Sequence, residues 1–188
     1  MKLWLLPPDA PSWHAPDPSK LGMPYWAFAW PGGVALARYV LDHPEVVRGK
    51  HVLDFGSGCA IEAIAAARAG AKFVLCSDID PQALKAGERN AAQNGVTLRA
   101  TTTDLMGVEL HGVDVLLVGD VCYDEAIAQR LIPWLRAQAA RGITVLVGDP
   151  LRVSGALEGA EVLATHDCPF DGDPRGTTLW PTQVLRIA

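Results

Sequence analysis

Between residues 51 and 149 the sequence alternates between short apolar runs and longer segments of helical character. The apolar runs, each predicted to be a buried strand, lie at 51–55, 72–77, 96–101, 113–119 and 143–149. Helices are predicted between them at 59–70, 80–95 and 124–141. We expect Pro133 to split or kink the last helix, because proline cannot donate the backbone hydrogen bond. Strands and helices that alternate in this way predict an α/β protein with a mostly parallel sheet.

The segments on either side of this alternation differ from it. Residues 1–22 are rich in proline, and we predict an irregular N-terminal arm followed by a single domain over 23–188. Apolar residues at helical spacing predict a further helix at 33–42. Residues 160–168 and 177–188 are predicted to be two more strands, joined by a turn rich in Gly, Pro and Asp. They would form an antiparallel hairpin at the edge of the sheet.

The composition argues against several classes of function. The 188 residues carry a formal net charge of −5 and contain no local run of Lys or Arg, which disfavours a broad nucleic-acid-binding face. The four cysteines form no Cys-x-x-Cys pair, so no metal site is expected. Reduced thiols, together with the lack of a signal-peptide pattern and of a membrane-length apolar run, predict a cytoplasmic protein.

A glycine-rich turn at 56–58 follows the first predicted strand. Such a turn lets the backbone approach a nucleoside closely. Ile61 occupies the position where a dinucleotide fingerprint requires Gly or Ala, which disfavours a nicotinamide-dependent oxidoreductase. Asp54 stands two positions before the first glycine. A carboxylate there suits a ligand with an ammonium and a sulfonium group better than it suits a pyrophosphate.

Acidic residues also follow the later strands. Asp78 comes about 20 residues after the glycine turn, where an acid usually bonds ribose hydroxyls. Asp104 is expected to accept a hydrogen bond from an adenine amino group, with Leu105 packed on the ring. With Asp54 and Asp120, four acids would then lie at one sheet edge, which favours S-adenosylmethionine as the ligand. Taken singly, each acid could instead be a helix cap or a turn residue.

Several motifs together resemble a known family. "VLDFGSGCA", "SDIDPQAL" and "DL" are similar to the class I, seven-strand methyltransferases. The combination of "PYWAFAWPGG", "GSGCA", "DIDP", "GDVCYDE" and "GDPLR" resembles the lysine methyltransferases of the group that modifies the electron transfer flavoprotein β subunit. The resemblance covers residues 23–152, with a weaker match at 177–180. It implies a Rossmann-like seven-stranded sheet with helices on both faces, and transfer of methyl groups to protein lysines, which leaves S-adenosylhomocysteine.

Two positions depart from the pattern of that family. Ala60 stands where a third glycine is usual, and Leu151 stands where "GDPGR" is usual. Ala60 is a small change that we expect to leave cofactor binding intact. Leu151 lies near the presumed substrate face, so the exact substrate stays open.

The cofactor-binding residues are expected to be Trp30, Asp54, Gly56, Ser57, Gly58, Asp78, Ile79, Asp104 and Leu105. In the aromatic stretch, Tyr25 and Trp26 are expected to line the acceptor channel, while Phe28 packs the protein. Gly32 and Gly33 would allow close approach. The alternatives are that these rings pack the first helix onto the sheet, or that they anchor a protein partner.

The catalytic residues are expected to be Asp120 and Tyr123. "DVCY" is spaced like the Asp/Asn-x-x-Tyr motif of amine methyltransferases. Asp120, with the carbonyl of Val121, would orient a neutral amine, and Tyr123 would shape its pocket. Asp149 and Arg152 are expected to contact the protein substrate, or alternatively to form a surface ion pair.

The expected partner is a protein substrate such as the electron transfer flavoprotein β subunit. We expect a monomer that engages neither nucleic acid nor membrane. One alternative is an N-methyltransferase of the same fold that acts on a small amine or metabolite. Another is a binding protein that has kept the cofactor pocket and lost the chemistry.

Overall fold

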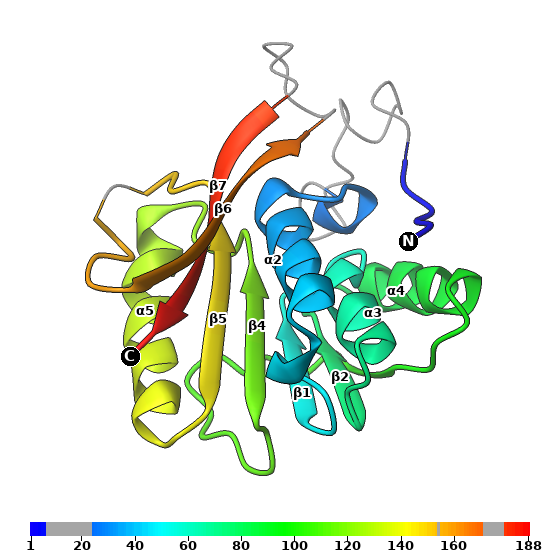
Figure 1. Ribbon diagram of the computed structural model, residues 1–188, viewed down its shortest axis with the longest axis horizontal. Helices are drawn as coiled ribbons and strands as arrows, with labels where there is room; N and C mark the ends of the chain where they lie inside the picture. Colours follow the sequence, from blue (N-terminus) through cyan, green and yellow to red (C-terminus); the bar gives the residue numbers. More distant parts are fainter. Residues whose placement is uncertain (7–23, 154, 171–178) are drawn as a thin grey trace.

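The computed structural model describes residues 1–6, 24–153, 155–170 and 179–188. It contains a seven-stranded sheet in the order β3-β2-β1-β4-β5-β7-β6 (Figure 1). The strands are β1 (His51–Phe55), β2 (Phe73–Ser77), β3 (Arg99–Thr101), β4 (Val115–Gly119), β5 (Thr144–Asp149), β6 (Glu161–Pro169) and β7 (Leu179–Ile187). The first five strands are parallel, and β7 runs antiparallel to both β5 and β6. The predicted fold class, including the C-terminal hairpin, is confirmed.

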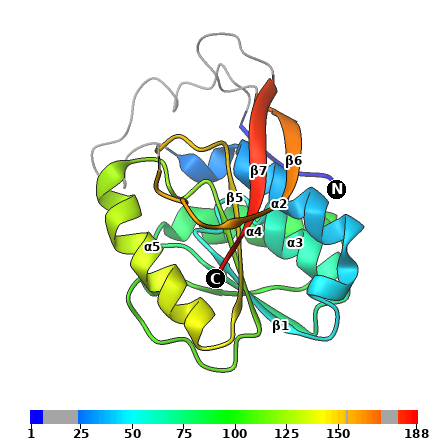
Figure 2. The ribbon, with the colours of Figure 1, turned by 60° about the vertical axis from the view of Figure 1, so that its left-hand side comes forward.

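Helices cover both faces of the sheet (Figure 2). They are α2 (Pro31–Asp42), α3 (Ile61–Arg68), α4 (Pro81–Gln93) and α5 (Glu125–Ala140), with 3-10 turns η1 (Tyr25–Ala27) and η2 (Pro44–Val46). A hydrophobic core lies on each face of the sheet. Neighbouring residues of β4 contribute to different cores, because successive side chains of a strand point to opposite faces. Leu117 packs in the cluster with α2 and α3, whereas Leu116 packs in the cluster with α5.

Helix α5 is continuous through Pro133. The expected split is therefore not observed. Pro133 and Gln129 both lie on the exposed side of the helix. The carbonyl of Gln129, which proline deprives of its hydrogen-bond donor, can thus be satisfied by water.

The N-terminal residues 1–6 are tied to α4 and η1. The backbone N–H of Lys2 donates to Asn94 Oδ1 (3.0 Å), and that of Trp4 donates to Asn90 Oδ1 (2.5 Å). Leu6 N–H donates to the carbonyl of Ala27 (3.1 Å). The rest of the predicted arm, residues 7–22, lies outside the described residues. In the parts of the chain that the structure describes, no helix is both long and apolar enough to cross a membrane.

Three non-glycine residues among those described have a positive φ: Ala60 (62°), Asp120 (55°) and Leu151 (60°). Ala60 and Leu151 are the two positions at which the sequence resemblance leads us to expect glycine. The left-handed conformation costs an L-residue about 1–2 kcal/mol, and glycine does not incur this cost.

Leu151→Gly is therefore expected to raise the free energy of unfolding by about 0.5 kcal/mol, after the greater chain entropy of glycine is subtracted. Leu151 is exposed, so little packing is lost with its side chain. Urea unfolding measures the change, with Leu151→Ala as the control that keeps the backbone strain. An equal gain in both variants would contradict the backbone explanation. Ala60→Gly should gain nothing, because the buried methyl group of Ala60 is lost.

Candidate active site

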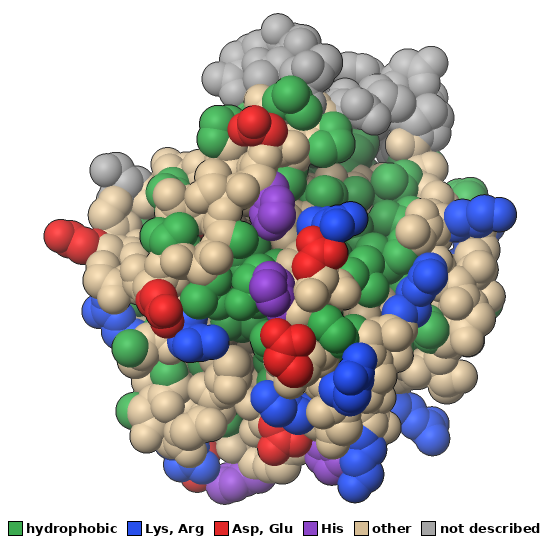
Figure 3. All heavy atoms as spheres, viewed as in Figure 1, with side chains coloured by type: hydrophobic (Ala, Val, Ile, Leu, Met, Phe, Trp, Pro, Cys, Tyr) green, Lys and Arg blue, Asp and Glu red, His purple; other side chains and the backbone are tan. Residues whose placement is uncertain are grey.

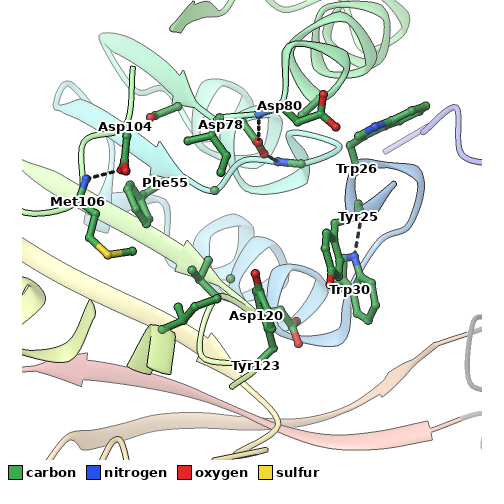
Figure 4. Close-up of a pocket in the computed structure, with 18 of the residues that line it drawn as sticks. Tyr25, Trp26, Trp30, Phe55, Asp78, Asp80, Asp104, Met106, Asp120 and Tyr123 are labelled. Carbon is green, nitrogen blue, oxygen red and sulfur yellow. Dashed lines mark hydrogen bonds between the residues drawn. The ribbon is translucent and has the colours of Figure 1, made fainter. Parts of the chain in front are cut away.

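A cavity of about 540 Å³ lies at the carboxyl ends of β1 and β4. The strand order reverses between these two strands, and ligands of open α/β sheets bind at this point. Its volume is typical of a small-molecule site, for which about 300–1,000 Å³ is usual. The predicted residues that line it are Tyr25, Trp26, Trp30, Gly56, Gly58, Asp78, Ile79, Asp104, Leu105, Asp120, Tyr123 and Arg152. Figure 4 shows Asp78 and Asp104 on one side of the cavity, and Asp120 and Tyr123 on the other.

Asp78 braces the glycine turn. Its Oδ2 accepts a hydrogen bond from the backbone of Gly58 (2.8 Å), and its Oδ1 accepts one from Asp80 (2.9 Å). Burial raises the pKa of Asp78, which the two backbone donors partly offset. Because each carboxylate oxygen has two lone pairs, Asp78 keeps acceptor capacity for a ligand hydroxyl.

Backbone conformation and close packing explain why the turn has glycine at positions 56 and 58. Both Gly56 (φ 68°) and Gly58 (φ 48°) adopt the left-handed conformation. A Cβ on Gly56 would also lie 2.9 Å from Val121 Cγ2, which is closer than carbon atoms normally approach. The turn therefore packs directly against the loop after β4, and the two halves of the cavity meet there.

Asp104 forms the far wall of the cavity. Its Oδ1 accepts a hydrogen bond from Met106 N–H (2.9 Å), an Asx turn that was one of the alternatives for this residue. The turn fixes the direction of the carboxylate while leaving lone pairs for a ligand. Leu105 and Met106 supply apolar surface beside it.

Asp54, in β1 just before the glycine turn, and Ser57, within the turn, are buried and do not line the cavity. Asp54 belongs to β1 itself rather than to the loop that follows it. Its Oδ2 accepts a hydrogen bond from Ala63 N–H (3.0 Å) in the first turn of α3. Burial raises the pKa of Asp54 to about 7. The structure thus places Asp54 as a brace for α3, and three of the four expected acids share the cavity.

Asp120 is held by backbone on one side and by a cation on the other. Its carboxylate accepts hydrogen bonds from Gly32 N–H, at the N-terminus of α2, and from the guanidinium of Arg152. Its own N–H donates to the carbonyl of Gly148 (2.9 Å). Burial raises the pKa of Asp120, opposed by the charge and hydrogen bond of Arg152 and by the backbone of Gly32 and Gly33.

Gly32 and Gly33 permit close approach to the protein rather than to a ligand. A Cβ on Gly32 would come within 3.0 Å of both the Gly148 carbonyl and the Asp120 carboxylate. A Cβ on Gly33 would contact the carboxyl group of Glu62, which is buried between α2 and β4. Helix α2 therefore lies directly on the strands. This close contact places the N-terminus of α2 within hydrogen-bonding distance of Asp120.

Aromatic rings form the mouth of the cavity. Tyr25 and Tyr123 stack with ring centroids 5.5 Å apart, and both are about two-fifths exposed. Trp30 is fixed behind them, because its Nε1 donates to the carbonyl of Tyr25 (2.8 Å). Trp26 lines the same end of the cavity (Figure 4). Phe28 is buried in a separate cluster with Phe170, in agreement with the expected packing role.

Asp149 and Arg152 do not form an ion pair with each other. Asp149 is buried behind the cavity, and its Oδ1 accepts the backbone N–H groups of Leu151 (2.5 Å) and Arg152 (3.3 Å). Burial raises the pKa of Asp149 to about 6. The Arg152 side chain pairs with Asp120 instead, and the two side chains are only 18% and 5% exposed. The surface-pair alternative is therefore wrong.

The cysteines are free and buried. Burial raises the pKa of Cys122 to about 12, so its thiol is neutral at ordinary pH although it follows Asp120 closely. Among the described residues, no group of three or more His, Cys, Asp or Glu side chains could hold a metal ion.

Further residues line the cavity without having been predicted to do so: Phe55, Ser77, Asp80, Ala83, Met106, Gly119, Ile127 and Arg130. Val121, which was expected to contribute its carbonyl, also lines the cavity. Most of the unpredicted residues flank a residue that was predicted, so their nearness in sequence was a usable signal. Ala83, Ile127 and Arg130 had no such signal, because only the packing of α4 and α5 brings them to the cavity.

Comparison with known proteins gives related methyltransferases. A family model described as "Ribosomal protein L11 methyltransferase (PrmA)" matches residues 35–122. The solved structure of ribosomal protein L11 methylase from Lactobacillus delbrueckii subsp. bulgaricus is 25% identical, with a TM-score of 0.59 over 83% of this chain and 79% of that chain.

Two curated relatives are more specific. The electron transfer flavoprotein beta subunit lysine methyltransferase of Danio rerio is 46% identical over 74% of this chain and 53% of its own length. The homolog from Caenorhabditis elegans is 34% identical over 99% of this chain and 82% of its own length. The chain thus spans about half the length of the Danio relative and most of the Caenorhabditis one. It belongs to the family of the electron transfer flavoprotein beta subunit lysine methyltransferases.

Proposed function

We propose that the chain is an S-adenosylmethionine-dependent N-methyltransferase that modifies lysine side chains of a protein, with the electron transfer flavoprotein β subunit as the substrate. The observation that carries this proposal is the composition of the cavity. One side has a braced glycine turn and the acids Asp78 and Asp104, and the other has the buried carboxylate of Asp120 behind a mouth of aromatic rings.

The residues of the first side fit S-adenosylmethionine. Asp78 would bond the ribose hydroxyls, and Asp104 with Leu105 would hold the adenine. The glycine turn, Ile79 and Trp30 would border the rest of the molecule. When bound, this cofactor supplies a methyl group on a sulfonium, and S-adenosylhomocysteine is the product.

The residues of the second side would favour the neutral form of the acceptor lysine amine and orient it. A lysine amine has an ordinary pKa of about 10.4, and transfer to burial among Tyr25, Trp26 and Trp30 favours its neutral form. Asp120 and the Val121 carbonyl would accept the amine N–H groups, so that the nitrogen lone pair points to the reacting methyl group. Tyr123 would limit the space around the amine. Proximity and alignment of this kind account for much of the rate in displacement reactions.

A protein acceptor is favoured over a small amine. The curated relatives and the matching family model are both named for protein substrates. The exposed rings of Tyr25 and Tyr123 are the residue type that anchors protein partners. The face shown in Figure 3 carries both acidic and basic side chains, and the formal net charge of −5 favours a protein over a nucleic acid as substrate. We further propose a monomer acting in the cytoplasm, in keeping with its free thiols.

Methyl labelling tests this function. The purified chain is incubated with S-adenosylmethionine carrying a labelled methyl group, and with either the purified flavoprotein β subunit or a cell extract. We expect label in one protein, on lysine by mass spectrometry. Label that appears only in the small-molecule fraction would establish the metabolite alternative instead.

Asp78→Ala is expected to weaken S-adenosylhomocysteine binding about 10- to 100-fold, because hydrogen bonds to a charged group contribute about 1.5–3 kcal/mol. Calorimetric titration measures the change. The matched control is Asp114→Ala, which also removes a carboxylate that accepts a backbone N–H (from His51, 2.8 Å) but lies at the opposite ends of the strands. Unchanged affinity in the Asp78 variant would remove this residue from the cofactor site.

A further inference from the structure

The guanidinium of Arg152 lies where the cavity meets the buried aromatic cluster. Its Cζ atom is 4.9 Å from the ring centroid of Trp180 and 5.7 Å from that of Trp30. Its Nη1 donates to Asp120 Oδ1. The side chain is 18% exposed, although arginine is among the residue types least often buried. This placement is thus specific, and the chain maintains it at a cost in solvation.

The turn after β5 aims Arg152 at this position. The Asp149 carboxylate accepts the N–H groups of both Leu151 and Arg152, and Leu151 adopts a left-handed φ of 60°. These features reverse the chain directly after the strand. The long side chain is then directed back across the cavity wall to Asp120, instead of out toward a substrate.

In the described part of the chain, the other titratable groups around Asp120 are two acids and two thiols. Glu62 from α3 and Asp149 from β5 are buried acids, and the charge of Asp120 raises the pKa of both. Cys122, and Cys168 of β6, are nearby thiols that burial keeps neutral. None of these four groups is a cation, and among the described residues the hydrogen bonds to the Asp120 carboxylate come from Gly32 and Arg152.

The protonation state of Asp120 decides what it can do for an amine. An ionised carboxylate accepts the amine N–H groups and leaves the nitrogen lone pair free. A protonated carboxyl would donate its O–H to that lone pair, which is the pair that must attack the methyl group. The acceptor role of Asp120 therefore requires its charged form.

We propose that Arg152 is a positioning residue for methyl transfer: it stays against the indole rings of Trp30 and Trp180 and holds the Asp120 carboxylate ionised and correctly oriented for the acceptor amine. This inference rests on the proposed function. It also assigns Arg152 to the wall of the site rather than to the substrate interface. Since like charges repel, the fixed guanidinium further favours entry of the neutral amine over the ammonium.

Arg152→Met, which keeps the length of the side chain without its charge, is expected to lower kcat about 10- to 100-fold with little change in KM for the protein substrate. The acidic limb of the pH profile of kcat should move to higher pH. The sign follows because loss of the cation raises the pKa of Asp120, so its ionised form predominates only at higher pH. Arg152→Lys should be intermediate, since lysine keeps the charge but not the planar fork.

The matched control is Arg38→Met. Arg38 also pairs with an aspartate, Asp42, at 2.6 Å, but both side chains are exposed. The wild-type pH profile is expected in this variant, because exposed ion pairs contribute about 0–1 kcal/mol. Added ethylguanidinium should partly restore kcat in an Arg152→Ala protein, where the truncated side chain leaves room for it, and should have no such effect on Arg38→Ala.

Two outcomes would overturn the inference. A lower KM and higher kcat/KM in Arg152→Met would make Arg152 a plug that the substrate displaces, and an unchanged pH profile would give it no role. A second readout does not depend on activity: carbon-13 NMR titration of the Asp120 carboxyl, assigned with Asp120→Asn. If wild-type protein methylates nothing, the proposed function fails. The NMR titration then decides alone, with a higher pKa of Asp120 in Arg152→Met supporting the inference and an equal one refuting it.

Discussion

Asp120→Asn is expected to lower turnover by about 10²- to 10⁴-fold while leaving the affinity for S-adenosylhomocysteine unchanged. Asparagine is the informative replacement, because it tolerates the left-handed φ of 55° and keeps the volume of the side chain. It removes the negative charge that would accept the amine N–H groups and that pairs with Arg152. Asp120→Ala should lose turnover to the same extent, with additional loss of stability from the backbone strain.

Single-turnover methylation and calorimetry separate the two effects of Asp120→Asn. The control is Asp124→Asn, four residues further on, where the side chain caps α5 through Ile127 N–H (2.8 Å). Asparagine caps a helix as well as aspartate does, so wild-type turnover is expected there. Normal methylation by Asp120→Asn would show that its assigned role is wrong. A parallel loss of cofactor affinity would instead place Asp120 among the cofactor contacts.

Gly32→Ala is expected to be strongly damaging to both stability and turnover. The new Cβ would overlap the Gly148 carbonyl and the Asp120 carboxylate, and neither the strand nor the ion-paired acid can move away easily. Overpacking of this kind costs about 2–3 kcal/mol, which for a chain of this size lowers Tm by about 4–12 °C. Turnover should also fall, because the displaced carboxylate no longer faces the acceptor amine.

Gly33→Ala is the graded comparison on the same helix. Its Cβ would meet the Glu62 carboxyl at 3.0 Å and Ile61 Cγ2 at 3.1 Å, and both are parts of side chains that can shift. We expect a smaller loss of stability and near-normal turnover. Thermal unfolding and methylation assays on both variants test this order. Equal effects, or a neutral Gly32→Ala, would mean that α2 is not held against β5 as described.

The alternation of apolar runs and helical segments was sufficient to determine the fold class. Strands and helices can be recognised from the local periodicity of apolar residues, and helix ends can be recognised from capping residues. Asp80 caps α4 through Gln82 N–H (2.8 Å) directly before Pro81, and Gly70 and Gly95 adopt the positive φ values that end α3 and α4. Such features depend on neighbours within a few residues, so the sequence alone contains the necessary information.

Which residues line the candidate site depends on the direction in which each side chain points and on tertiary packing. Neither can be read from a short stretch of sequence. Asp54 and Asp78 both come at the end of a β-strand in the sequence. Asp54 is a residue of the strand itself and points under α3, whereas Asp78 follows its strand and reaches the cavity. A shift of one residue exchanges the two faces of a strand, and strand ends are uncertain by more than that from sequence alone.

The pairing of Arg152 with Asp120 is a purely tertiary feature. The two residues are 32 positions apart, and Asp149 is the acid nearer to Arg152 in the sequence. The Leu151 turn directs the guanidinium away from that neighbour and toward the end of β4. The sequence alone determined the elements of this protein and the chemical types at the sheet edge. Packing decided which acid pairs with Arg152, because burial and counter-charges come from segments distant in the chain.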